Sequence, residues 1–243
     1  MLLNVVEAGS GPRCAVLLHG MLGSAESWQR VVPLLVDAGY RVLALDLPGH
    51  GLSPRDPTMT LEGAADAVVD TVRAFVDHPP AVAIGHSYGA LLLAAAAERM
   101  RPRLAVYVDA PLAFPGGADR DATLARYKRD KRVRTPQRLR ETRSHYSEAD
   151  AVVEGRAAER FDPATSASIS AGPGGSWAPS PGSIVLRAEP SEFVTDADVR
   201  VLWEHGVDVR SIPGAAHTVW YSHFDAFVAA LPEIFSPDVG GPS

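Results

Sequence analysis

Residues 81–97 read Ala81-Val-Ala-Ile-Gly85-His86-Ser87-Tyr88-Gly89-Ala90-Leu-Leu-Leu-Ala-Ala-Ala-Ala97. A short apolar run precedes a Gly-X-Ser-X-Gly turn, and an alanine-rich run typical of a helix follows. Glycines are needed at both flanks because a side chain there would collide with the neighbouring strand or helix. The turn holds Ser87 on a strained backbone at a helix start, where the dipole and backbone N–H groups favour a developing negative charge. The pattern predicts Ser87 as a nucleophile.

The rest of the chain repeats this alternation of short apolar runs and longer helical patterns. Such a rhythm is typical of a mostly parallel sheet with helices on both faces, a doubly wound α/β domain. Ser24 is a suitable N-cap for the first helix, and Thr58 or Thr60 for the second. The predicted strands are 2–7, 14–19, 41–46, 81–85, 103–109, 183–188 and 207–212, and the predicted helices are 25–37, 60–76, 88–100, 196–205 and 220–232.

One long segment interrupts the alternation. Between strands 103–109 and 183–188 the chain runs through Pro/Gly punctuation and a charged helical pattern, which is more than an ordinary crossover needs. We interpret 111–181 as a helical cap inserted over the carboxyl ends of the strands. The predicted core is then 1–110 with 182–235, and 236–243 is expected to be a disordered tail.

Composition narrows the function classes. The 243 residues are 46% hydrophobic with a net charge of −6, which is typical of a weakly acidic enzyme and not of a nucleic-acid-binding or membrane-surface protein. The single cysteine, Cys14, lies in an apolar run and is expected to be a buried small hydrophobe. Neither a charged leader with a long apolar stretch nor an 18-residue apolar run occurs, so we expect a cytoplasmic protein.

A second glycine-containing motif, Val16-Leu-Leu-His19-Gly20-Met21-Leu22-Gly23-Ser24, ends an earlier predicted strand. The backbone N–H groups of Met21 and Tyr88 are our candidates for an oxyanion hole, Tyr88 being the residue after the nucleophile. The alternative is that these glycines serve only a strand-to-helix turn.

Two further blocks complete the pattern: Ala44-Leu-Asp46-Leu-Pro-Gly49-His50-Gly51-Leu-Ser53 and Pro213-Gly-Ala-Ala-His217-Thr-Val219. With them the chain resembles the α/β-hydrolase superfamily over almost its full length, and in particular small capped esterase-like serine hydrolases. The nucleophile loop reads Ser-Tyr-Gly-Ala where Ser-Met-Gly-Gly is common. The resemblance implies that His217 is the base, with His223 as its only rival, and that Asp46 braces its own loop.

The acid of the expected triad has two candidates. The family's usual place, after strand 183–188, reads Arg187-Ala188-Glu189-Pro190-Ser191-Glu192, which puts Ser191 in the register of the aspartate. Glu192 lies one residue out of register. Asp109, at the end of strand 103–109, is favoured because some members resembled here carry the acid after that strand. A strand-end aspartate that merely caps the next turn is the alternative for Asp109.

The composition of the predicted cap bears on the charge of the substrate. Residues 120–143 hold ten basic side chains against three acidic ones, so the segment is either a solvated helix face or a surface that attracts an anionic or carrier-bound substrate, with Arg129 and Arg132 as test residues. Aromatic side chains could line an apolar pocket at the strand ends. Our candidates for that lining are Phe114, Trp177 and Trp220, with Tyr88 and Phe193 as further possibilities.

The leading hypothesis is hydrolysis of an ester, thioester or lactone of a small molecule through an acyl-serine, with no metal or organic cofactor. The same triad could instead serve carbon–carbon bond hydrolysis, a lyase or a cyclase, because a fold does not fix a reaction. A ligand receptor on a hydrolase fold is a third hypothesis, against which the intact serine and histidine argue. Haloalkane dehalogenases and typical epoxide hydrolases of this fold use an aspartate nucleophile, whereas here the position is Ser87.

Overall fold

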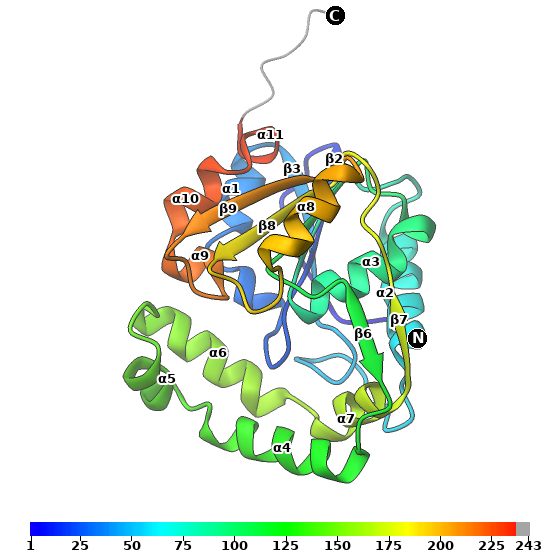
Figure 1. Ribbon diagram of the computed structural model, residues 1–243, viewed down its shortest axis with the longest axis vertical. Coiled ribbons are helices and arrows are strands. Elements are labelled where there is room, and N and C mark those ends of the chain that lie inside the picture. Colours follow the sequence, from blue (N-terminus) through cyan, green and yellow to red (C-terminus); the bar gives the residue numbers. More distant parts are fainter. Residues whose placement is uncertain (237–243) are drawn as a thin grey trace, which may run out of the picture.

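The computed structural model describes residues 1–236, and its centre is a seven-stranded sheet (Figure 1). The predicted tail lies outside the described residues except for Ser236. The strands are β1 (Val5–Ala8), β2 (Arg13–Leu18), β3 (Tyr40–Leu45), β4 (Val82–His86), β5 (Leu104–Val108), β8 (Ile184–Glu189) and β9 (Asp208–Pro213). They lie in the order β1-β3-β2-β4-β5-β8-β9, and each neighbouring pair is parallel except β1 with β3.

Both faces of the sheet are buried under helices, which is why its central strands are almost continuously apolar. In β2, for example, Leu17 faces one apolar layer and Leu18 the other, and both are fully buried. One layer packs against α2 (Leu61–Phe75), α3 (Tyr88–Met100) and α8 (Asp196–Glu204). The other packs against α1 (Val32–Asp37), α9 (Val219–Ser222), α10 (Phe224–Ala229) and α11 (Pro232–Phe235). The predicted doubly wound architecture is confirmed.

All seven predicted strands are present with slightly shifted ends, as are the predicted helices 60–76, 88–100 and 196–205. Of the two suggested caps for α2, Thr60 is the one in place, since its hydroxyl accepts a hydrogen bond from Gly63 N at 3.1 Å. Cys14 is buried as expected, and burial raises the pKa of its thiol to about 11.

Two predicted helices are wrong in their continuity. The stretch 25–37 divides into a 3-10 helix, η1 (Ala25–Trp28), and α1, because Pro33 has no N–H and is tolerated only in the first turn of a helix. The stretch 220–232 divides into α9 and α10 at His223, where φ is −138°, and Pro232 opens α11 for the same reason as Pro33.

The inserted segment 111–181 contains four helices and a two-stranded ribbon. The helices are α4 (Arg120–Val133), α5 (Pro136–Thr142), α6 (Glu148–Arg160) and α7 (Pro163–Ala171). The ribbon, β6 (Ala113–Gly116) with β7 (Pro173–Ser176), pairs the two ends of the insertion, which the sequence did not predict. Figure 1 shows the four helices gathered on one side of the core. They contact the loops after β2 and β3: Asp162 N donates to Gly49 O at 2.7 Å, and α6 packs against η1.

Among the helices of residues 1–236, none combines the length and the apolar content that crossing a lipid bilayer requires.

Candidate active site

The turn around Ser87 joins β4 to α3 with a strained backbone. Ser87 has φ 51° and ψ −117°, a conformation that a residue with a side chain rarely adopts. A Cβ on Gly85 would lie 2.6 Å from the Ala90 Cα, and one on Gly89 would lie 2.3 Å from the Leu18 carbonyl oxygen. Both flanking positions therefore require glycine, as the sequence indicated. The result is a half-buried serine held at the start of α3.

The loop after β2 approaches this turn closely. A Cβ on Gly20 would lie 3.3 Å from the Ser87 Cβ and 2.7 Å from the His86 Nδ1. The backbone of the Gly20–Met21 segment therefore passes directly beside the serine, and Tyr88 follows Ser87 at the start of α3. The two residues proposed for an oxyanion hole, Met21 and Tyr88, therefore both lie next to the Ser87 turn.

Asp109 and His217 are brought together from the ends of β5 and β9. The His217 Nδ1 lies 2.7 Å from the Asp109 Oδ2, and the other carboxylate oxygen, Oδ1, accepts from Ala188 N at 3.1 Å and from Ser191 Oγ at 2.7 Å. Asp109 is 1% exposed and has φ 43°, so its carboxylate is buried and fully hydrogen-bonded on a strained backbone. Of the two sequence candidates for the acid, this is the one that contacts His217.

Glu192 and His223, the alternatives from the sequence, lie elsewhere. Glu192 is exposed, and its neighbour Ser191 instead contacts Asp109. The Nδ1 of His223 is buried without a hydrogen-bond partner in the described part of the chain, and it does not share the Asp109 carboxylate. The sequence places Ser191 in the register of the family's aspartate, but it gave no sign that the Ser191 hydroxyl would donate to Asp109.

His217 is held by its neighbours as well as by the carboxylate. Its ring lies 4.5 Å from the Phe193 ring and 4.6 Å from the His86 ring, measured between centroids. The His86 Nε2 donates to the His217 carbonyl oxygen at 2.9 Å, which ties the His217 backbone to the residue preceding Ser87. The side chain of His217 is 34% exposed, so one edge of the ring remains accessible.

Three other histidines, His19, His50 and His86, hydrogen-bond the backbone of loops around Ser87. The His19 Nε2 accepts from Leu47 N at 3.0 Å, and the His50 Nε2 accepts from Leu22 N at 3.3 Å. Burial lowers the pKa of all three, to about 3 for His50 and well below the ordinary value for His86, so they are neutral at neutral pH.

Asp46 performs the bracing role expected of it. Its carboxylate accepts from Ala25 N at 2.7 Å, from Leu52 N at 2.9 Å and from Asn4 Nδ2 at 2.8 Å. It therefore holds the loop after β3 against η1 and has no contact with His217 among these bonds.

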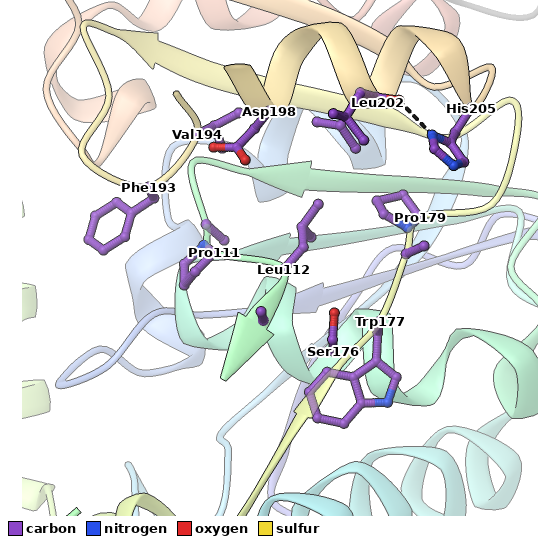
Figure 2. A pocket seen from close by; sticks show the side chains of 14 residues that line it. Pro111, Leu112, Ser176, Trp177, Pro179, Phe193, Val194, Asp198, Leu202 and His205 are labelled. Atoms are coloured by element: carbon purple, nitrogen blue, oxygen red, sulfur yellow. Dashed lines mark hydrogen bonds between the residues drawn. The ribbon is translucent and has the colours of Figure 1, made fainter. Parts of the chain in front are cut away.

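A pocket of about 440 Å³ lies beside the acid, between α8 and the two ends of the insertion. Its lining is mainly apolar and includes Ala110, Leu112, Trp177, Phe193 and Leu202. Figure 2 shows Phe193 at one end, with Trp177 and His205 toward the other. Because the Phe193 ring also packs against the His217 ring, one lining residue of this pocket contacts the candidate base.

The three predicted pocket residues have different positions. Trp177 lines this pocket, whereas Phe114 packs partly buried against the adjoining core. Trp220 is buried in the opposite layer, stacked on Trp28 at 4.2 Å between centroids, with its Nε1 donating to Ser27 O at 3.1 Å. Its place in the core corrects the expectation that it lines this pocket. The sequence alone does not tell a tryptophan that lines a pocket from one that packs in the core.

Residues 15–230 match the model of the alpha/beta hydrolase family. The chain belongs to this family. Among curated relatives of this hydrolase, Methylesterase 8 of Arabidopsis thaliana is 36% identical over 95 residues, which cover 38% of this chain and 35% of the relative. Bifunctional epoxide hydrolase 2 of Mus musculus is 38% identical over 94 residues, which cover 37% of this chain and 17% of the relative. The hydrolase thus matches only about a third or less of each relative's length.

Solved structures resemble the hydrolase over nearly its whole length. An N-formylmaleamic acid deformylase from Pseudomonas putida S16 has a TM-score of 0.76 at 17% identity, covering 93% of this chain and 94% of that one. An esterase from Thermogutta terrifontis has a TM-score of 0.72 at 20% identity, covering 95% and 92%. At these identities the likeness establishes the fold.

The basic residues of the inserted segment 111–181 include both exposed and buried side chains. Arg129 and Arg132 are exposed on α4. Arg134, just after α4, is instead largely buried, and its Nη2 donates to the Glu154 Oε2 at 2.7 Å.

In residues 1–236, no group of three His, Cys, Asp or Glu side chains is placed to hold a metal ion.

Proposed function

We propose that this hydrolase cleaves an ester, thioester or lactone of a small organic substrate through an acyl-Ser87 intermediate. The observation that carries the proposal is the 2.7 Å contact between the His217 Nδ1 and the buried Asp109 Oδ2, at the same end of the sheet as the strained Ser87 turn. A carboxylate on Nδ1 fixes the imidazole tautomer, which leaves Nε2 able to accept a proton.

In the first half-reaction, the Ser87 Oγ attacks the substrate carbonyl carbon while the His217 Nε2 takes the hydroxyl proton. The carbonyl oxygen becomes an oxyanion, which the backbone N–H groups of Met21 and Tyr88 stabilise. When the tetrahedral intermediate collapses, the carbon–oxygen or carbon–sulfur bond to the leaving group breaks, and His217 gives its proton to that group. The acyl group then remains on Ser87.

In the second half-reaction, water takes the place of the leaving group. His217 accepts one proton from the water as its oxygen attacks the acyl carbon, and the same proton is returned to the Ser87 Oγ when the acyl–serine bond breaks. The products are a carboxylic acid and the regenerated hydroxyl. Throughout, the Asp109 carboxylate keeps its hydrogen bond to the His217 Nδ1 and stabilises the imidazolium.

The residue at the nucleophile position, and not the comparisons, favours ester chemistry over epoxide opening. Both a methylesterase and an epoxide hydrolase are about equally similar to this chain. Epoxide hydrolases of this fold use an aspartate nucleophile, and the nucleophile position here is Ser87. A serine alkoxide that forms an acyl ester matches the chemistry of an esterase.

The test is burst kinetics with short- and medium-chain p-nitrophenyl esters. We expect Ser87→Ala and Asp109→Asn to lose turnover, with Glu192→Gln as the matched carboxylate control that keeps it. Retention of turnover by Ser87→Ala would refute the proposal. If wild-type protein turned over no ester while Ser87 still reacted with a fluorophosphonate, the triad would be competent for another reaction, such as carbon–carbon hydrolysis, and ester hydrolysis would be rejected.

The substrate's charge is a separate part of the proposal. Arg129 and Arg132 place exposed positive charges on α4, which would attract an anionic or carrier-bound substrate. Replacing both by glutamine should raise KM for an anionic ester more than for its neutral isostere, and more at low ionic strength. Arg103→Gln is the control, because Arg103 is exposed and precedes β5, at the end of that strand away from Asp109. Equal effects on both esters would remove the idea.

A further inference from the structure

The loop after β8 holds no carboxylate in contact with His217, yet it reaches the acid. Ser191 in this loop is the residue in the register where the resembled family carries its aspartate. Its Oγ lies 2.7 Å from the Asp109 Oδ1, although the two residues are 82 positions apart in the sequence. The serine is partly buried and contacts the oxygen of the carboxylate that does not face His217.

The hydroxyl of Ser191 has a single possible orientation. A serine hydroxyl has one proton to donate and two lone pairs to accept with. The Ser191 Oγ accepts from Phe193 N at 3.0 Å and from Val194 N at 3.0 Å, which uses both lone pairs. Its proton therefore goes to Asp109. A hydroxyl with a fixed proton directs the carboxylate more strictly than one that can rotate.

Hydrogen bonds to both oxygens also restrain the Asp109 carboxylate. With Ser191 Oγ and Ala188 N both donating to Oδ1, the plane of the carboxylate is set, and Oδ2 points at the His217 Nδ1. Two residues further along the same loop, the Phe193 ring packs against the imidazole at 4.5 Å. The loop thus contacts both members of the Asp109–His217 pair.

We propose that residues 190–194 form a positioning clamp for the Asp109–His217 pair, in which Ser191 orients the acid and Phe193 supports the base. This inference rests on the proposed function, because it assigns a role only if Asp109 and His217 act together. Ser191 is a positioning residue in this scheme: it touches neither substrate nor reacting atoms, and it acts through Asp109.

The test compares Ser191→Ala with Ser147→Ala. Ser147 is a matched control because its Oγ also donates to a carboxylate, that of Asp150, at 2.7 Å, and accepts a backbone N–H, but in the cap at the start of α6. We expect Ser191→Ala to lower kcat about 10- to 100-fold, the scale of one hydrogen bond to a charged group, with KM changed less than about twofold. Ser147→Ala should leave kcat unchanged.

Two further variants separate positioning from loop stability. Ser191→Thr keeps the hydroxyl and should recover most of the lost kcat. In an Asp109→Asn background, Ser191→Ala should have almost no further effect on residual kcat, because a residue that acts through Asp109 loses its target with it. A merely structural role would lower activity by the same factor in both backgrounds.

The clamp would be refuted by a wild-type kcat in Ser191→Ala, by an equal loss in Ser147→Ala, by no recovery in Ser191→Thr, or by additive losses in the double variant. A fault in the proposed function has a different signature. If Asp109→Asn alone kept wild-type kcat, the assignment of the acid would fail. If Asp109→Asn were inactive while Ser191→Ala was fully active, only the clamp would fail.

Discussion

Replacing Asp109 by asparagine should abolish turnover while preserving the fold. The substitution keeps the shape of the side chain but exchanges one acceptor oxygen for an NH2 group that only donates. Three donors face the present carboxylate, namely His217 Nδ1, Ala188 N and Ser191 Oγ. An asparagine can accept from the donors on one side only, so one of its two sides must lose its hydrogen bond or change.

The structure indicates which side changes. The Ala188 N–H belongs to the backbone and cannot become an acceptor, so the asparagine oxygen is expected to stay at the Oδ1 position. Its NH2 group then faces the His217 Nδ1, and the imidazole can avoid a clash of two donors by moving its proton to Nε2. In that tautomer Nε2 cannot take the Ser87 proton. We expect kcat to fall by about 10³- to 10⁴-fold, the scale that a wrong tautomer costs in a serine protease.

The effect of Asp109→Asn on stability should be small. The free energy of unfolding should fall by about 1–3 kcal/mol, because one hydrogen bond to a charged group is lost and the side-chain volume is unchanged. The assay pairs kcat on a p-nitrophenyl ester with urea denaturation, and Glu192→Gln is the exposed control. Retention of more than about a tenth of wild-type kcat would contradict the tautomer argument. A loss of folding would also contradict it, since the reasoning requires a folded, inactive protein.

Three other measurements test the fold and the loops around the site. Gly89→Ala should lower the unfolding free energy by at least about 1–3 kcal/mol in urea titrations, because its Cβ would lie 2.3 Å from the Leu18 carbonyl oxygen. Cys14, whose pKa is raised to about 11 by burial, should resist alkylation by iodoacetamide in the native protein and react after denaturation; reaction in the native state would show that it is exposed. Burial lowers the pKa of His50 from 6.5 to about 3, so below about pH 6.5 the unfolded chain binds more protons than the folded protein. The free energy of unfolding should therefore decrease as the pH is lowered from about 6.5 toward 3, by up to about 1.4 kcal/mol per pH unit for this group. His50→Gln should make that pH dependence shallower, and an unchanged slope in urea titrations at several pH values would contradict the assignment.

Local patterns were sufficient for most of the sheet and for the serine turn. Each central strand is a short apolar run because it is buried on both faces, and the Ser87 turn is marked by two glycines that the packing requires. The same local reading failed where a single residue decides the backbone. Pro33 divides one predicted helix, although the apolar pattern continues across it.

Contacts between residues far apart in the sequence could not be predicted from local sequence patterns. The β6–β7 ribbon joins two four-residue strands rich in glycine and proline, which carry no alternation of apolar and polar side chains. The contact between Ser191 and Asp109 depends on the register of β5 with β8 and on one side-chain rotamer. Trp220 was assigned to the pocket because an aromatic residue near a strand end looks the same from sequence whether it faces substrate or core.

The position of the insertion between β5 and β8 has a practical consequence. These two strands are hydrogen-bonded neighbours in the sheet, although the cap separates them along the chain. A break in the inserted segment 111–181 would therefore yield one fragment with Ser87 and Asp109 and another with Ser191 and His217, so neither fragment would hold all three residues of the proposed triad. The two fragments would have to pair along the β5–β8 edge to bring these residues together, which suits this chain to the design of a split-enzyme reporter.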